Sequence, residues 1–455
     1  MKKWICLALA ACLAAGLTAC GGAKETADDT KAEQTETAAA EKKEKEEETD
    51  SSDISQNADG FIEIHSAEDF VQFAELFKEE AINSRERRVN LNAVLMADID
   101  LSDAIPADST LLPLGGEYFV EKDGKESTVW ASFAGEFDGN GHTISGIHLD
   151  VTDRGRSAGL FHTAYTWDDP AVSIHDLTIA DSSFSGNANY MGAFAGSAST
   201  NTLFENCTVA ETVTVESSGE SSRTGGIAGY AEEGGNMFYH CTNYGTVTGS
   251  DPGGILGGAG SDTCLVQCDN YGSVTGERSA AGIINRHDGS SGYAGIVIGC
   301  VNYGEVRSTG TACGIVCTNG STLRYCVNAG RVEGKEAFAI GEKDGSIYAC
   351  GNIGTVSAAD PYIYRFGYSW DLGTYEGFSE EEVSENRGYT GEALMGKDIE
   401  VIPMDPSAAA DGSLTAILQE MEDYGCWTQG DGFPVWDGTG GVEKYERICE
   451  VLEIR

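Results

Sequence analysis

One short motif recurs between Cys241 and Val356 and limits what the chain can fold into. It reads Cys-x-Asn-x-Gly-x-Val and begins at Cys241, Cys268, Cys300, Cys326 and Cys350, while Cys207 opens a degenerate earlier copy. The spacings from Cys207 onward are 34, 27, 32, 26 and 24 residues. A motif that returns at such a period indicates a stack of structural repeats, each too small to bury its own apolar face.

Each repeat contains two further apolar runs. One precedes the cysteine, as in Met237–His240, and the other follows it, as in Gly254-Ile255-Leu256-Gly257. All three runs are flanked by Gly, Asn, Asp or Ser, as is typical of short strands joined by turns, and the repeat is too short to include a helix as well. Three short strands per repeat predict an all-β solenoid in which each strand pairs in parallel with its equivalent one turn away, about 4.8 Å on. We expect about eight turns between Thr143 and Tyr364.

Stacking assigns roles to the repeated residues, because a position that recurs in every turn lies above its counterpart. We expect the cysteines to form an inward column, since free cysteine is among the most buried residue types. These are Cys207, Cys241, Cys268, Cys300, Cys326 and Cys350. In-register Cβ atoms about 4.8 Å apart do not suit a disulfide, which needs about 3.8 Å, so the thiols are predicted to be free.

The repeated asparagines are predicted to form a ladder of amides along the axis. They are Asn243, Asn270, Asn302, Asn328 and Asn352. Two cysteine pairs, Cys264 with Cys268 and Cys313 with Cys317, have a spacing that a metal site could also use. Positions four apart on a strand share a face, so we expect Cys264, Val266 and Cys268, and likewise Cys313, Ile315 and Cys317, to point inward as core residues. No metal site is expected.

A tyrosine follows the ladder asparagine in three copies and is predicted to face outward. Tyr244, Tyr271 and Tyr303 would form a column whose rings either bind sugar faces or a partner protein, or only stack on one another and shield the turn. Both interpretations remain open.

Taken together, the repeated motifs resemble the GLUG repeats of bacterial surface proteins. The resemblance rests on the Cys-x-Asn-x-Gly-x-Val and Gly-Gly-Ile-x-Gly pairs, on the stretch Phe133–Ile147 and on Ala158-Gly-Leu-Phe161, and it covers roughly residues 130–360. It implies a right-handed parallel β-helix on a cell surface, of the kind found in the non-catalytic part of IgA-cleaving metallopeptidases. The last copies depart from the pattern, since Ala329 and Ile353 replace the tyrosine.

The N-terminus has the pattern of an export signal. Lys2 and Lys3 precede an apolar run from Trp4 to Leu17 that is too short to span a membrane. The sequence Leu17-Thr-Ala-Cys20 resembles a bacterial lipobox, which implies that residues 1–19 are removed and that Cys20 carries the lipid and a membrane anchor. Residues 20–60 are acidic and have too little apolar surface to bury, so we expect a disordered tether.

Both ends of the solenoid need covers for their strand edges. Residues 61–130 are predicted to form an N-terminal cap, in which Ser66–Asn83 is an amphipathic helix that begins with a capping box. The β-helix then occupies 131–365, and 366–455 form a C-terminal cap with a helix over Leu414–Asp423. The aromatic residues of Cys426-Trp427 and Phe433–Trp436 are packing residues of this cap or, alternatively, a ligand platform.

Charge and motifs exclude several functions. A formal net charge of −44 repels phosphate backbones, so nucleic acid is not an expected partner. The seven histidines include no His-Glu-x-x-His, so a zinc peptidase has no site. Candidate carboxylates for a polysaccharide lyase or glycosidase, the alternative function, are Asp98, Asp100 and Asp138, with His142 beside them. We expect a monomeric, non-catalytic, extracytoplasmic lipoprotein of the bacterial envelope that binds a glycan or protein and needs no cofactor.

Overall fold

The computed structural model describes residues 54–84, 87–106, 109–122, 125–151, 157–165, 172–232, 234–260, 262–288, 295–320, 322–341, 346–360, 368–381, 383, 388–390, 401–421 and 426–438. These belong to one compact unit, Ser52–Arg455. The predicted signal peptide, Cys20 and most of the tether lie outside the described residues. No helix among those that are described is long and apolar enough to cross a membrane.

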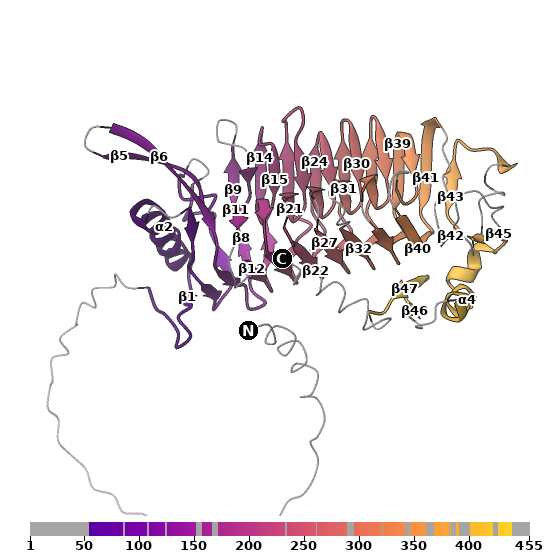
Figure 1. Cartoon of the computed structure of the whole chain (residues 1–455), viewed down its shortest axis with the longest axis horizontal. Helices are drawn as coiled ribbons and strands as arrows, with labels where there is room; N and C mark the ends of the chain where they lie inside the picture. Colours follow the sequence, from indigo (N-terminus) through magenta and orange to yellow (C-terminus); the bar gives the residue numbers. More distant parts are fainter. Residues whose placement is uncertain are drawn as a thin grey trace, which may run out of the picture. The chain divides into compact units, whose positions relative to one another are not determined.

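The unit is a parallel β-helix with three faces, and its strands stack rung upon rung (Figure 1). The first face has two strands per turn. Its leading strands are β1 (Ile62–Ile64), β3 (Ala93–Leu95), β7 (Glu136–Asp138), β12 (Val172–His175), β17 (Thr202–Glu205), β22 (Met237–Tyr239), β27 (Cys264–Val266), β32 (Ile296–Ile298), β37 (Thr322–Arg324), β40 (Ser346–Asn352) and β42 (Tyr368–Asp371). Its trailing strands are β4 (Ile99–Asp100), β8 (Thr143–Ser145), β13 (Thr178–Ala180), β18 (Thr208–Val209), β23 (Thr242–Asn243), β28 (Asp269–Asn270), β33 (Val301–Asn302) and β38 (Val327–Asn328).

The second face also has two strands per turn, and the third has one. The second contains β9 (His148–Asp150), β14 (Ser183–Gly186), β19 (Thr214–Ser217), β24 (Thr246–Gly249), β29 (Val274–Gly276), β34 (Val306–Ser308), β39 (Arg331–Phe338), β41 (Thr355–Asp360) and β43 (Thr374–Glu376), followed within a turn by β10 (Ser157–Ala158), β15 (Tyr190–Gly192), β20 (Arg223–Gly225), β25 (Asp251–Gly253), β30 (Ser279–Ala281) and β35 (Thr311–Cys313). The third contains β2 (Arg88–Val89), β6 (Lys125–Phe133), β11 (Phe161–Tyr165), β16 (Ala195–Ser199), β21 (Ala228–Ala231), β26 (Leu256–Ala259), β31 (Ile284–His287) and β36 (Val316–Asn319).

The predicted parallel β-helix is confirmed by this pairing. Each turn contains five short strands and not the three expected, because breaks divide the strands of the first and second faces. The column that carries the repeated motif runs β8, β13, β18, β23, β28, β33, β38 and the second half of β40, all in parallel register, which gives the eight expected turns. The stacking also extends into the region expected to be the N-terminal cap, because β1 pairs with β3 and β3 with β7.

A left-handed residue bends the first face immediately before each cysteine. The φ angles there are 51° at Asn206, 52° at His240, 50° at Gln267, 65° at Gly299, 57° at Tyr325 and 50° at Ala349. The bend interrupts the alternation of side chains along the chain. The expectation that Cys264 and Val266 point inward with Cys268 is therefore wrong: Cys268 joins the central core, whereas Cys264 and Val266 pack in a separate cluster with the C-terminal Trp427.

The other cysteine pair departs from the expectation in a similar way. Ile315 belongs to the central core, but Cys313 and Cys317 form a small cluster with Ala281 and Phe338. The physical reason is that the chain turns at Gly314, between β35 and β36, so that Cys313 and Cys317 lie on two different strands. Cys317 Sγ donates to the carbonyl oxygen of Ala280 at 3.0 Å.

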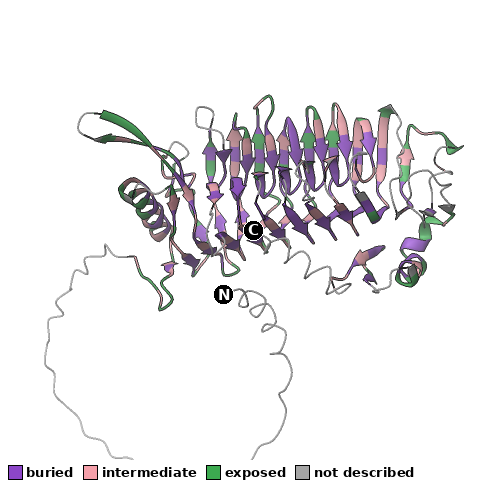
Figure 2. Cartoon of the chain, in the orientation of Figure 1, coloured by how far each residue is buried: buried purple, intermediate pink, exposed green. Residues whose placement is uncertain are grey.

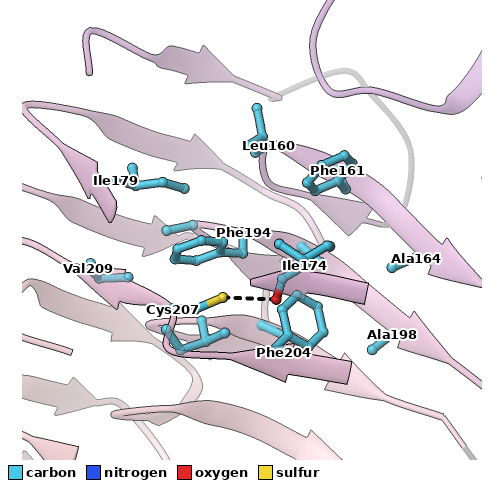
Figure 3. Packing of buried hydrophobic residues seen from close by; sticks show 14 of the residues in the cluster. Leu160, Phe161, Ala164, Ile174, Ile179, Phe194, Ala198, Phe204, Cys207 and Val209 are labelled. Atoms are coloured by element: carbon cyan, nitrogen blue, oxygen red, sulfur yellow. Dashed lines mark hydrogen bonds between the residues drawn. The ribbon is translucent and has the colours of Figure 1, made fainter. Parts of the chain in front are cut away.

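The central core is a continuous column of apolar side chains inside the three faces (Figure 3). The strands that surround it carry many buried residues (Figure 2). Phe204 stacks on Phe238 of the next turn with ring centroids 5.0 Å apart. Cys207 lies in this column, and its Sγ donates to the carbonyl oxygen of Ile174 at 3.3 Å (Figure 3). Along the same column the residue becomes smaller in later turns, with Leu265 and then Val297 in register after Phe238.

The second glycine of Gly-Gly-Ile is explained by its approach to the asparagine column. A Cβ on Gly254 would lie 2.4 Å from Asn270 Cγ and 2.1 Å from the carbonyl oxygen of Gly282. No side chain fits in such a space, so the two repeated motifs depend on each other.

The N-terminal end of the β-helix is covered by a helix and carries an arm. Helix α2 (Ala67–Ser84) buries Phe70, Phe73 and Phe77, and the Ser66 hydroxyl accepts the Asp69 N–H at 3.2 Å. Strand β5 (Gly116–Lys122) pairs antiparallel with β6 to form an arm that projects beyond the sheet (Figure 1).

The C-terminal segment packs on the outside of the first face. It comprises β44 (Gly388–Thr390), β45 (Val401–Ile402), the 3-10 helix η1 (Pro406–Ala409), α4 (Ser413–Met421), β46 (Trp427–Gln429) and β47 (Pro434–Trp436). The Tyr325 ring meets both Trp427, at 5.5 Å between centroids, and Trp436, at 6.1 Å. The aromatic residues of this segment therefore serve as packing residues.

Candidate functional site: an aromatic groove on the third face

A groove of about 660 Å³ lies on the outer side of the third face, beside the base of the arm. This is within the volume range of ligand sites, roughly 300–1,000 Å³. It is lined by Arg87, Trp130, Ala131, Ser132, His162, Thr163, Tyr165, Ser199, Thr200, Tyr230 and Glu232. The lining comes from strands β6, β11, β16 and β21, which are neighbours in the sheet, and from residues beside them.

Trp130 forms one wall of the groove. It lies on β6 opposite Glu117 of β5 and is 44% exposed. Its ring meets the His162 ring edge-on, with centroids 6.1 Å apart. The base of the arm is fixed on its other side, where the Tyr118 hydroxyl accepts the Gly115 N–H at 3.0 Å.

His162 lies at the foot of this wall as a neutral ring. Burial lowers its pKa to about 4, so the imidazole carries no charge near neutral pH. Its Nδ1 is 3.0 Å from the Thr163 hydroxyl. The ring needs a glycine across from it, because a Cβ on Gly116 would lie 2.8 Å from His162 Cδ2.

Hydroxyl groups follow one another across the strands of the groove. The Thr163 and Ser197 hydroxyls are 2.9 Å apart on adjacent strands. Further along, the Ser199 hydroxyl donates to Glu232 Oε2 at 2.7 Å. Of these hydroxyl groups, those of Thr163 and Ser199 line the groove, and they follow one another in the direction of the helix axis.

Tyr230 forms the opposite end of the groove. Its ring stacks on Tyr190 with centroids 4.9 Å apart and nearly parallel planes, 17°. The Arg223 guanidinium lies over the Tyr230 ring at 4.8 Å and is 3.7 Å from the Asp288 carboxylate. These contacts hold the tyrosine ring in one orientation.

The chemistry of the groove favours binding over hydrolysis. Aromatic rings and hydroxyl groups dominate the lining, and the charged side chains are Arg87 and Glu232. The usual hydrolysis of a glycosidic bond needs two carboxylates, and Glu232 is the only carboxylate among the described lining residues. Sequence reasoning missed this site, because its residues lie outside the repeated motif and come together only through the winding of the chain.

The predicted tyrosine column is present on another part of the molecule. Tyr244 and Tyr271 are 45% and 42% exposed, and the ring centroids are 4.8 Å apart from Tyr244 to Tyr271 and 4.3 Å from Tyr271 to Tyr303. Tyr303 is half-buried, with its ring 5.9 Å from that of Phe433 in the C-terminal segment. The rings therefore stack on one another, and Tyr303 also contacts the C-terminal segment.

The carboxylates considered for catalysis are used in turns and in an ion-pair cluster. Asp98 Oδ1 accepts the Thr143 N–H at 3.0 Å and lies 3.2 Å from His142 Nδ1, and these contacts lower the pKa of Asp98. Asp100 accepts the Ser102 N–H at 3.0 Å. Asp138 accepts the Asn140 N–H at 2.7 Å, as in a turn.

His175 is the centre of that cluster. Its Nδ1 is 2.9 Å from Asp176, its Nε2 is 3.1 Å from Glu136, and Asp138 lies 3.6 Å away. Burial would lower the pKa of His175, but the hydrogen bonds to Glu136 and Asp176 and the charge of Asp138 raise it to about 9. Asp138, His175 and Asp176 are close enough together to hold a metal ion. However, a protonated imidazole donates from both nitrogens and has no lone pair for a metal.

The asparagines and cysteines of the repeat form two parallel columns. From Asn243 to Asn352, the Nδ2 of each ladder asparagine donates to Oδ1 of the next at 2.9 Å. The column ends on Asp371, whose Oδ1 accepts from Asn352 at 3.1 Å. All six cysteines of the other column are buried and free. Burial raises the pKa of the thiols of Cys241, Cys268 and Cys300.

The fold and groove define a class of protein: a parallel β-helix with an aromatic groove on one face. No protein-family model matches the chain, and no curated protein matches it either. Among solved structures, it is similar to one from Bacteroides ovatus described as "a putative immunoglobulin A1 protease". The identity is 14%, the TM-score is 0.44, and the match covers 84% of this chain and 94% of the other.

Proposed function

We propose that this protein is a lipid-anchored protein of the bacterial cell envelope that binds glycans through the groove on the third face of its β-helix. The observation that carries the proposal is the groove itself, in which the rings of Trp130 and Tyr230 stand at the two ends of a row of hydroxyl groups. Aromatic side chains offer large apolar faces, and hydroxyls offer donors and acceptors, which together match the two kinds of surface on a sugar ring.

The anchor is proposed from the sequence. The apolar run that ends in Leu17-Thr-Ala-Cys20 supports lipidation of Cys20, and the acidic segment behind it supports a tether that holds the β-helix away from the membrane. The scaffold is proposed to derive from GLUG-type repeats, on the strength of the paired motifs.

Binding to a glycan array tests the function, with Trp130→Ala as the variant and Tyr244→Ala as its control. Both residues are exposed aromatics, but Tyr244 lies outside the groove. We expect Trp130→Ala to lose about tenfold or more in affinity, equivalent to about 1.4 kcal/mol, and Tyr244→Ala to bind like the unaltered protein. Equal binding by both variants would place the ligand elsewhere. If the protein still binds glycoproteins after their glycans have been removed enzymatically, the ligand is a protein instead.

The anchor is tested separately by fractionation after labelling of cells with a fatty acid. Cys20→Ala protein should take up no label and leave the membrane fraction. Label and membrane retention in that variant would overturn the anchor, whatever the groove binds.

A further inference from the structure

The groove also indicates what part of a glycan it takes. Resting on the proposed function, we infer that the ligand is an internal stretch of a neutral polysaccharide that runs along the axis of the β-helix from the arm to Tyr230, and not a terminal sugar.

The aromatic surface continues from the groove onto the arm. Phe119 is 80% exposed, the most exposed of the large apolar side chains in the described part of the chain. In the register of the arm it faces Thr128, while Glu117 faces Trp130. Alternate residues of a strand and directly opposed residues share a face, so Phe119 and Trp130 lie on the same side of the arm. Phe119 therefore extends the wall that Trp130 begins.

The length of this surface exceeds one sugar ring. Trp130 lies on β6 and Tyr230 on β21, with β11 and β16 paired between them. Three strand spacings amount to about 14 Å along the axis, and the step from Trp130 to Phe119 adds about 6–7 Å. Hydroxyls of Thr163 and Ser199 lie between the two ends.

The groove ends at Tyr230. The residue in register with Tyr230 one strand further is Gly258, and the Arg223 side chain lies over that glycine with its guanidinium 4.8 Å from the Tyr230 ring. The length of the surface between Phe119 and Tyr230 matches several linked sugar rings and not a single terminal sugar.

The charge of the lining favours a neutral polymer. Arg87 and Glu232 are of opposite sign, and His162 is uncharged near neutral pH because burial holds its pKa at about 4. The chain as a whole carries −44 charges, which would repel a polymer of uronic acids over its length.

The inference is tested by calorimetric titration with neutral oligosaccharides of the cello-, laminari- and malto- series, each from disaccharide to octasaccharide. In the series that binds, we expect affinity to rise by at least about tenfold from the disaccharide to the hexasaccharide, as further rings reach Phe119 and Tyr230. Phe119→Ala should lower hexasaccharide affinity several-fold and leave the disaccharide unchanged. Trp130→Ala should weaken both. Phe119 is exposed, so its removal is expected to leave folding intact, which circular dichroism checks.

The outcomes separate this inference from the proposed function. Equal affinity for short and long oligosaccharides, or an unchanged hexasaccharide affinity in Phe119→Ala, would refute the internal-chain inference. The proposed function would still stand in that case if Trp130→Ala weakened binding. Stronger binding of uronic-acid oligomers of matched length would refute the neutral polymer. Absence of binding by every glycan on the array would refute both proposals.

Discussion

Truncation of Asn302 to alanine probes the ladder that joins successive turns. The amide of Asn302 donates to Asn328 Oδ1 at 2.9 Å and to the Gly304 carbonyl at 3.1 Å, and it accepts from Asn270 Nδ2 at 2.9 Å. The side chain is fully buried, so the variant leaves one donor and two acceptors without these partners. Each unsatisfied buried group costs about 1–3 kcal/mol.

The expected loss for Asn302→Ala is about 2–5 kcal/mol in the free energy of unfolding, below the full sum because Asn270 Nδ2 keeps its bond to the Gly272 carbonyl. Asn187→Ala is the matched control. Asn187 is exposed in the same β-helix, and a substitution there should stay within about 0.5 kcal/mol.

Urea unfolding followed by circular dichroism measures the difference, and hydrogen exchange of the amides near residues 270 and 328 shows whether the loss is local. Exchange is needed because long repeat arrays can lose two-state behaviour. If Asn302→Ala unfolds at the same urea concentration as Asn187→Ala, the ladder bonds do not stabilise the stack and the reasoning is refuted.

Three further predictions concern buried and titrating groups. The six column thiols should react with a thiol reagent only after the protein has been denatured without reductant, and a denatured protein with none of these thiols free would show disulfides instead. Cys300→Ser should lower the free energy of unfolding by about 1–3 kcal/mol, which is more than Cys300→Ala should. The pKa of His175 rises from 6.5 to about 9 on folding, so its contribution to the free energy of unfolding should be fully present below pH 6.5 and be lost as pH rises through 9. In His175→Gln, the fall in stability over this pH range should be about 1–3 kcal/mol smaller. If the free energy of unfolding of this variant depends on pH as that of the unaltered protein does, the ion-pair cluster is contradicted. Burial, with Cys268 nearby, raises the pKa of Asp269 from 3.8 to about 7, so the stability of the folded protein should fall as pH rises between those values. In thermal unfolding scans, Asp269→Asn should show a smaller fall over this pH range. A pH dependence equal to that of the unaltered protein would contradict the prediction.

Whether a side chain points into the core or away from it could be predicted only where the strand is regular. Cys268 was placed correctly in the core because it follows the bend and belongs to the repeated motif. Cys264 was not, because Gln267 adopts a φ of 50° between them. The residue at that position changes from turn to turn among Asn, His, Gln, Gly, Tyr and Ala, so its conformation leaves no signature in the sequence. The backbone is held there by pairing with adjacent turns and not by residue type.

The sequence by itself determined the repeat of this protein: a β-helix of about eight turns, with a cysteine position that recurs in six of them and an asparagine position that recurs in five. These features can be recognised in the sequence because a stacked repeat interacts mainly with its neighbours, so the same residue types recur at each period. The groove was decided only by the tertiary structure. Trp130, His162 and Tyr230 are separated by 32 and 68 residues and belong to no common motif, and winding brings them onto one face. Which outward residues meet depends on the register between turns and on the place where the arm leaves the sheet, and both are properties of the assembled β-helix.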